Sequence, residues 1–179
     1  EGNSKVPVWQ GELYLERHRG TLTGIAKNKR NNRKSEVLYQ ETEWICSMAN
    51  ALTGRLFPKK KLHEGWEMIL TNQFHDIIPG SSIEEVYKVC DRDYATIRDL
   101  AEGEKSAAVE EILNRVSAKG QYVVFNPHSF AHSGVILANG KAYYVENVPA
   151  KGYAVYSLAD SKNAVTIDNK TVHTPFFDV

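Results

Sequence analysis

Residues 81–116 read SSIEEVYKVCDRDYATIRDLAEGEKSAAVEEILNRV and carry the most extended periodic pattern of the chain. Apolar residues recur at three- and four-residue steps over 83–116, which is the spacing of one buried face of an α-helix. Ser81 and Ser82 are each followed three residues later by a glutamate, which is typical of a capping box. We therefore expect one long helix, on the order of 50 Å at roughly 1.5 Å per residue, with Gly103 as a weak point.

Two segments upstream repeat the helical spacing. Apolar residues follow it over 37–52, and the pattern ends before Gly54. A second pattern covers 62–74 and ends at the Pro79-Gly80 turn, because the residue before a proline leaves the helical region. Short turns join the three segments, so a bundle of three antiparallel helices is expected over residues 27–119.

The sequence pattern changes at Lys119-Gly120, after which β-branched and aromatic residues alternate. Five runs of this kind lie at 122–125, 134–138, 141–146, 153–158 and 164–167. Asn139-Gly140, between the second and third runs, is typical of a type I′ hairpin turn. Residues 120–179 are therefore expected to be the opening antiparallel strands of a β-sandwich, and the fold class is α+β.

Residues 1–26 match neither pattern. Trp9–Glu16 alternates like a β-strand, but no nearby segment offers a strand to pair with it. We interpret residues 1–26 as the tail of a preceding domain. The chain opens at Glu1 without the basic and apolar regions of a signal peptide, which favours an excised or processed piece.

Composition excludes several classes of protein. The 179 residues hold 22 basic and 22 acidic side chains, and the apolar runs are too short to cross a membrane, so neither a strongly charged partner nor a membrane is implied. The basic run 27–34 has no interleaved aromatic residues, which favours a solvated helix start over a nucleic-acid site. Cys46 and Cys90 lack the spacing of a metal or disulfide site, so we expect two reduced core thiols in an intracellular protein.

The residues that best suit chemistry are Asn72-Gln73-Phe74-His75-Asp76, at the end of the second predicted helix. In a functional interpretation, the His75 imidazole binds a divalent metal and Asp76 supplies an oxygen to a ligand hydroxyl. In the alternative, His75 caps the last helical turn and Asp76 is a solvated turn residue. The residues alone favour the alternative, because one histidine without a second ligand at a fixed offset is a weak metal signal.

A second polar cluster is Glu16-Arg17-His18-Arg19. Arginine and histidine at the end of a strand suit the recognition of hydroxyl-rich or anionic groups, whereas a charged loop of salt bridges explains the same residues equally well. The remaining histidines are scattered in predicted turns without a common face, at positions 63, 128, 132 and 173.

Two stretches resemble signature segments of glycoside hydrolase family 38 α-mannosidases: residues 9–21, WQGELYLERHRGT, and residues 72–82, NQFHDIIPGSS. Residues 122–127 and 148–153 resemble the start of the carboxy-terminal β domain of that family. The resemblance implies the end of a catalytic α/β barrel at 1–26, then the three-helix middle domain, then the first strands of the β domain. The His-Arg-Gly-Thr stretch is similar to that of microbial and cytosolic members, which implies a cytoplasmic location.

The resemblance also implies a chemistry. Family members retain the anomeric configuration, using a zinc ion, a nucleophilic aspartate and a second carboxyl group. The match makes His75 the last zinc ligand and Asp76 a contact to sugar hydroxyls, and it places the nucleophile and the acid/base upstream, so no catalytic residue is expected here. Phe74 stands where many members have another histidine, which is not the ligand. With the resemblance, the ligand role of His75 is favoured over the cap.

The implied function is therefore that of a piece of a zinc-dependent retaining α-mannosidase, acting on terminal α-linked mannose of glycans or oligosaccharides and inactive alone. Its partners would be the carbohydrate and the rest of the parent chain, with a homo-oligomer left open. One alternative is a non-catalytic helical module that binds a carbohydrate or a protein. Another is a relative that hydrolyses mannosylated small molecules such as mannosylglycerate.

Overall fold

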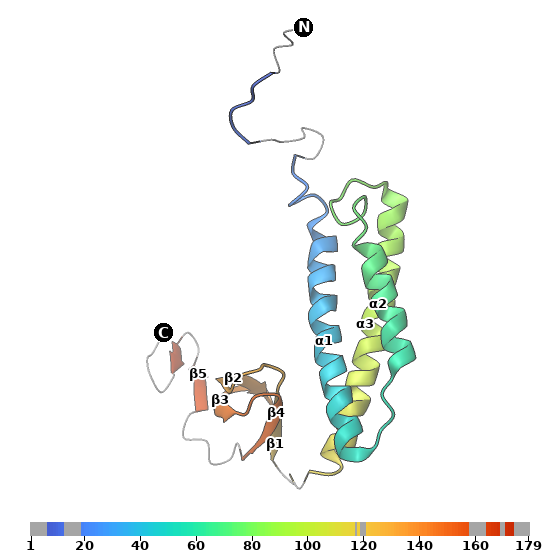
Figure 1. Cartoon of the computed structure of the whole chain (residues 1–179). Helices are drawn as coiled ribbons and strands as arrows, with labels where there is room; N and C mark the ends of the chain where they lie inside the picture. The colour runs from blue at the N-terminus through green and yellow to red at the C-terminus, as the bar shows by residue number, and fades with distance from the viewer. Residues whose placement is uncertain are drawn as a thin grey trace. The chain divides into compact units, whose positions relative to one another are not determined.

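The computed structural model describes residues 7–12, 19–116, 118, 121–157, 164–168 and 171–173. It shows three helices followed by short antiparallel strands (Figure 1), which confirms the α+β class and its order. The helices are α1 (Ala26–Thr53), α2 (Lys59–Asn72) and α3 (Glu84–Leu113). The strands are β1 (Tyr122–Asn126), β2 (His132–Ala138), β3 (Lys141–Val148), β4 (Gly152–Tyr156), β5 (Ala164–Asp168) and β6 (Thr171–His173).

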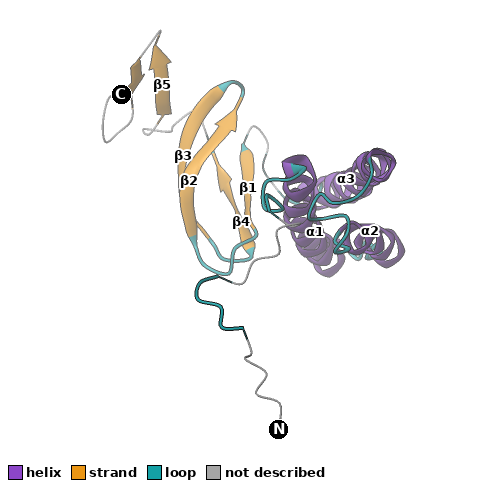
Figure 2. Ribbon diagram, turned by 90° about the horizontal axis from the view of Figure 1, so that it is seen from above, coloured by secondary structure: helices purple, strands orange, loops and turns teal. Residues whose placement is uncertain are grey.

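Two compact units make up the chain: residues 1–40 with 59–102, and residues 41–58 with 103–179. In the first unit the three helices pack side by side, as the end-on view of Figure 2 shows. Their shared core is apolar apart from two tyrosine hydroxyls and one thiol, and consists of Tyr39, Leu62, Ile69, Cys90, Tyr94, Ile97 and Ala101.

Tyr39 is the central side chain of this core and is fully buried. Its hydroxyl donates a hydrogen bond to the carbonyl of Ile97 at 3.0 Å, which joins α1 to α3. Its ring lies against Gly65 of α2, where a β-carbon would stand 1.7 Å from the tyrosine Oη. Trp66 adds an edge-to-face contact at 5.4 Å between ring centroids. Glycine is therefore required at position 65 for α1 and α2 to approach.

The second unit has its own core, formed by Ile45, Cys46, Ala49, Ala108 and Ile112. Trp44 contacts Phe125 of β1 edge to face, with 6.4 Å between the ring centroids.

Cys46 and Cys90 are both buried and unpaired, as expected. Burial raises the pKa of both thiols, that of Cys46 to about 11, so both stay protonated at neutral pH.

The strands form a pair, β1 with β4, and a sheet in the order β2-β3-β5-β6, all antiparallel. The β2–β3 hairpin turns at Asn139 and Gly140, whose φ values of 50° and 72° fit the predicted type I′ turn. β6 was not predicted, since its three residues are too few to show a pattern. Of the proposed domain boundaries, that at Lys119-Gly120 falls outside the described residues, and both boundaries remain proposals.

The basic run 27–34 lies at the start of a helix, as expected, but it is not solvated throughout. The helix begins at Ala26, so the basic run 27–34 lies inside it, and Asn28 is only 3% exposed. The interpretation as a solvated helix start is therefore wrong at this residue. The predicted alternating strand is not formed over the described residues 7–12, and residues 13–18 lie outside the description.

α3 also differs from the expectation in two details. It continues through Gly103 without a break. The predicted capping box does not form, because the Ser82 hydroxyl donates to the carbonyl of Asp76 while the Ser82 backbone N–H donates to the Tyr87 hydroxyl at 3.1 Å. The serine thus fixes the preceding turn instead of the helix start.

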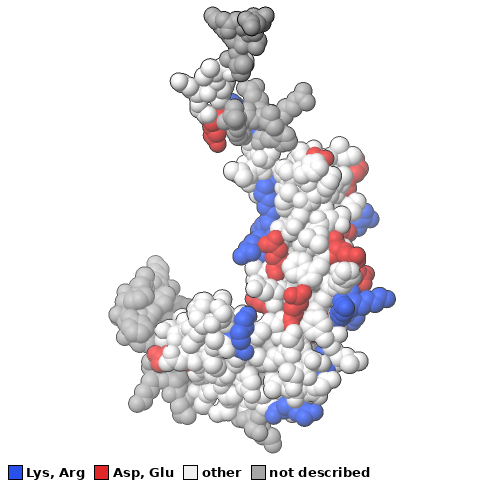
Figure 3. Space-filling view, in the orientation of Figure 1, with Lys and Arg blue, Asp and Glu red and all other residues white. Residues whose placement is uncertain are grey.

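Basic and acidic side chains are interspersed over the helical face shown in Figure 3, in keeping with their equal numbers. None of the helices in the described segments combines the length and apolarity needed to span a membrane.

Candidate functional site

The polar cluster selected from the sequence forms a tight turn directly after α2. Backbone N–H groups of Ile77 and Ile78 both donate to the carbonyl of Phe74, at 2.8 and 3.0 Å, and Gly80 donates to Ile77 at 3.1 Å. Pro79 has no N–H to donate and cannot continue a helix. The expected Pro-Gly turn is therefore present, and we call residues 73–80 the site turn.

His75 and Asp76 point their side chains to solvent from the site turn, 79% and 61% exposed. The His75 Nε2 lies 3.4 Å from the Asp76 Oδ2, and the imidazole is tilted against the Phe74 ring at 4.3 Å between centroids. The imidazole thus contacts a carboxylate and an aromatic ring instead of a carbonyl in the last turn of α2. The imidazole and the carboxylate therefore lie side by side on an exposed surface, where both are accessible to a ligand.

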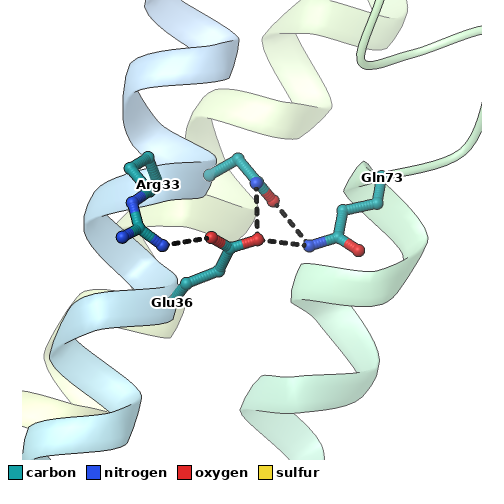
Figure 4. Close-up of polar contacts among 4 residues, drawn as sticks. Arg33, Glu36 and Gln73 are labelled. Atoms are coloured by element: carbon teal, nitrogen blue, oxygen red, sulfur yellow. Dashed lines mark hydrogen bonds and ion pairs between the residues drawn. The ribbon is translucent and has the colours of Figure 1, made fainter.

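Gln73, the first residue of the site turn, is held by α1 (Figure 4). Its side-chain amide donates to the Glu36 Oε1 and the Asn32 Oδ1, both at 3.0 Å. The same Glu36 oxygen accepts from the Asn32 Nδ2 at 3.0 Å, while the other accepts from Arg33 at 3.2 Å. Both carboxylate oxygens are therefore engaged, which fixes the acceptor that Gln73 meets.

Asn72, the last residue of α2, is held by α3. It is 1% exposed, and its amide donates to the Asp93 Oδ2 at 3.1 Å as well as to the carbonyl of Met68 at 2.9 Å. The two residues that lead into the site turn are therefore bound to different helices.

The far side of the site turn is held by Tyr87 and by close backbone packing. The Tyr87 hydroxyl donates to the carbonyl of Ile77 at 3.1 Å. Gly80 has a φ of +89°, and a β-carbon there would stand 2.8 Å from backbone atoms of Gly24. The backbone on both sides of His75 is thus fixed while its side chain remains exposed.

Sequence reasoning did not find most of these supporting residues. Gln73 stood in the selected cluster, but its partners Glu36 and Asn32 are 37 and 41 positions away. Tyr87 was counted only as an apolar position of the helix pattern. No local signal links these residues to the site turn, since helix packing alone brings them together.

Zinc needs more ligands than the site turn provides. Within the described ranges, no three His, Cys, Asp or Glu side chains gather at one place. Zinc sites in proteins use at least three protein ligands. The site turn by itself is therefore not a complete zinc site, and its exposed imidazole can supply one ligand at most.

The sequence profile of the alpha mannosidase middle domain matches residues 16–112, more than half of the chain. The chain belongs to this family. The match includes α1, α2, the site turn and nearly all of α3, and the resemblance to glycoside hydrolase family 38 α-mannosidases is confirmed.

Curated relatives of this middle domain are named α-mannosidases. An α-mannosidase of Saccharomyces cerevisiae is 46% identical over 85 residues, covering 46% of this chain and 8% of the yeast protein. Alpha-mannosidase 2C1 of Homo sapiens is 28% identical over 93% of this chain and 18% of the human protein. The chain therefore spans less than a fifth of the length of either relative.

A solved structure shares the fold of the middle domain. A glycosyl hydrolase family 38 protein from Enterococcus faecalis superposes with a TM-score of 0.60 at 21% identity, covering 66% of this chain and 15% of that one. An α-mannosidase from the same organism gives a TM-score of 0.58 at 20% identity, with 66% and 14% covered.

Three other histidines whose side chains the structure describes contact residues outside the site turn. Glu16, Arg17 and His18 lie outside the described residues. His63 pairs with Glu67 at 3.5 Å along α2. The rings of His128 and Phe130, between β1 and β2, and of His132, the first residue of β2, contact one another.

A cleft of about 1000 Å³ lies in the second unit, between the end of α3 and β1. Apolar side chains dominate its lining, with Val109, Leu113 and Phe125 among them. Its described lining carries no carboxylate, histidine or thiol, so it offers neither a metal ligand nor an acid–base group, and it is not the candidate site.

Proposed function

We propose that this chain is part of a zinc-dependent retaining α-mannosidase, in which the site turn supplies His75 as one zinc ligand and Asp76 as a contact to a sugar hydroxyl. The observation that carries the proposal is a fixed backbone that presents two adjacent, exposed side chains, an imidazole and a carboxylate. The α-mannosidase names of the curated relatives support the reaction class.

The two side chains suit these roles chemically. A neutral imidazole donates a nitrogen lone pair to zinc, and a carboxylate accepts hydrogen bonds from sugar hydroxyls. Zinc, when bound, supplies positive charge that orients and polarises substrate oxygens. The His75–Asp76 contact also orients the ring, as carboxylates next to metal-binding histidines do.

The bond-breaking groups are proposed to lie outside this chain. Retaining glycosidases use two carboxyl groups about 5–5.5 Å apart, on either side of the scissile bond. Asp76 is proposed only as a sugar contact and not as a member of that pair. We accordingly propose that these residues alone are inactive, and that the substrate is terminal α-linked mannose of a glycan or oligosaccharide met in the cytoplasm.

The test compares the full-length parent protein with its His75→Ala variant. Hydrolysis of an aryl α-mannoside and zinc content are measured on the same samples. We expect both to be lost, and because His75 is 79% exposed the fold should persist. His63→Ala is the matched control, since its imidazole is 72% exposed on α2 and pairs with a carboxylate in the same way.

Retention of zinc and of activity in His75→Ala would refute the proposed ligand role. Bound zinc without hydrolysis in the wild type would instead indicate a narrower substrate, and mannosylglycerate would be the next one assayed. Absence of both from the wild type would favour a non-catalytic module that binds carbohydrate or protein.

A further inference from the structure

We infer that Gln73 and Glu36 are positioning residues for His75: the carboxylate on α1 fixes the amide at the end of α2, and that amide sets the direction in which the site turn presents the imidazole. The inference rests on the proposed function of His75. It extends the proposed zinc site to supporting residues that do not touch the metal, one of them on α1.

The geometry makes Gln73 the point at which α1 controls the site turn. Its Nε2 lies 3.0 Å from both the Glu36 Oε1 and the Asn32 Oδ1, so both amide protons of Gln73 have acceptors. Because the acceptor is a carboxylate, the bond to Glu36 is stronger than one between neutral groups. His75 follows Gln73 by two residues, so Gln73 anchors the start of the site turn, while the Ile77 and Ile78 N–H bonds to the Phe74 carbonyl hold the backbone that follows.

Glu36 is itself fixed in the orientation that Gln73 needs. The Asn32 amide holds one carboxylate oxygen at 3.0 Å, and the Arg33 guanidinium holds the other at 3.2 Å. All three residues belong to the first turns of α1, so their relative positions follow from the helix itself. The orientation of the Gln73 amide is thus determined by a rigid element (Figure 4).

An exposed imidazole needs such support to act as a ligand. Its side chain is 79% exposed and contacts only its neighbours in the site turn, so backbone position is what the packed helices contribute to metal binding. Groups hydrogen-bonded to a metal ligand typically change metal affinity by 10–100-fold when removed, and we expect the lower end of that range for Gln73, which acts on His75 through the backbone. Loss of the Gln73–Glu36 contact should therefore weaken zinc binding while His75 remains present.

The test measures zinc affinity by chelator competition on the full-length parent protein, with helix content and melting temperature recorded for every variant. Gln73→Glu keeps the size of the side chain but sets a carboxylate against Glu36. We expect its zinc affinity to fall about tenfold. The double variant Gln73→Glu with Glu36→Gln restores a donor and an acceptor, so it should regain most of that loss.

Glu41→Gln is the matched control. Glu41 also lies on α1 and also contacts another helix, through Lys105 at 3.1 Å, with 38% of its side chain exposed against 32% for Glu36. It does not bond to the site turn, so its substitution should leave zinc affinity unchanged.

Coupling to His75 separates positioning from general destabilisation. The zinc ligands proposed upstream remain in His75→Ala, so its residual affinity can be measured at raised zinc concentration, and adding Gln73→Glu to that variant should not lower it further. Wild-type affinity in Gln73→Glu, or an equal loss with and without His75, would overturn the positioning role. Full zinc affinity in His75→Ala alone would overturn the proposed function, and this inference with it; the two failures are thus told apart by which variant changes.

Discussion

The two connections between helices are fastened in opposite ways. Residues 54–58, between α1 and α2, are held by a partly buried ion pair. The Arg55 guanidinium lies 2.8 Å from the Glu104 carboxylate, and the two side chains are only 22% and 11% exposed. The connection from 73 to 83 uses amide and hydroxyl hydrogen bonds and a close approach of two glycines. Its polar side chains at His75 and Asp76 face solvent instead.

This difference shows what a ligand-bearing turn requires. A charged side chain that holds its own loop is no longer available to a metal or a sugar. The site turn is therefore fastened by residues that are not needed for chemistry, at Gln73, Tyr87 and Gly80. The 54–58 connection has no such restriction and uses a partly buried ion pair.

The largest expected effect tests the glycine contact of the site turn. Gly80→Ala places a β-carbon 2.8 Å from the Gly24 backbone and also strains a φ of +89°. We expect the free energy of unfolding to fall by about 4 kcal/mol, from left-handed strain together with overpacking. Urea unfolding followed by tryptophan fluorescence measures it.

Gly54→Ala is the control that isolates strain. Gly54 has a similar φ of +80°, but nothing lies within 4 Å of an added β-carbon. Its cost should be about 1 kcal/mol, from the left-handed conformation alone. Equal losses in the two alanine variants would show that close packing does not fasten the site turn.

A smaller effect is expected from breaking the ion pair of the other connection. Arg55→Met removes the positive charge beside the Glu104 carboxylate, which is 11% exposed. We expect a loss of about 2 kcal/mol in the free energy of unfolding, less than for a fully buried pair because Arg55 is partly solvated.

Lys88→Met provides the matched control for that prediction. Lys88 pairs with Glu84 at the same 2.8 Å, but the two side chains are 65% and 77% exposed. Exposed pairs contribute about 0.5 kcal/mol or less. If both methionine variants lost equally little stability, the Arg55–Glu104 ion pair would not be what holds residues 54–58 in place.

The smallest expected effect uses Cys46 to report on the same connection. Its thiol faces the Glu104 carbonyl, and burial raises its pKa from 9.0 to about 11, with Glu104 raising it and Arg55 lowering it. Above about pH 9 the unfolded chain loses this proton while the folded chain keeps it. The stability that the thiol contributes is therefore fully present only below pH 9 and is lost as the pH rises toward 11.

The thiol should make the free energy of unfolding about 1 kcal/mol lower at pH 10 than at pH 8. Urea unfolding at the two pH values measures the difference, and Cys46→Ala should remove that part of it. Burial also raises the pKa of Tyr39, to about 12 from 10.0, which adds a further decline above about pH 10 in both proteins. An unchanged pH dependence in Cys46→Ala would show that the thiol does not titrate in this range.

The helices were largely predictable because apolar spacing marks their faces, while Gly54 and Pro79-Gly80 mark where the first two end. The burial at the start of α1 was not predictable, since that part of the bundle buries polar residues such as Asn28 and Ser35, at 3% and 7% exposed. Hydrophobic patterning does not detect a polar interface. The capping box failed because the Tyr87 hydroxyl, provided by tertiary packing, accepts the Ser82 N–H.

The candidate site was predictable in its turn but not in its support. Pro79-Gly80 marks the site turn in the sequence, and resemblance to a family gives His75 and Asp76 their proposed roles. What holds them comes from α1 and α3, at distances along the chain that no local pattern records. Family resemblance therefore points to the ligand, whereas packing shows what directs it.

The contact between Tyr39 and Gly65 constrains how this fold diverges among related proteins. Because the phenol ring fills the space of the missing side chain, the two positions cannot vary independently. A relative with alanine or a larger residue where Gly65 stands must carry a smaller residue where Tyr39 stands, and it then loses the hydroxyl that reaches Ile97. The two positions should covary, as a glycine–tyrosine pair exchanged together.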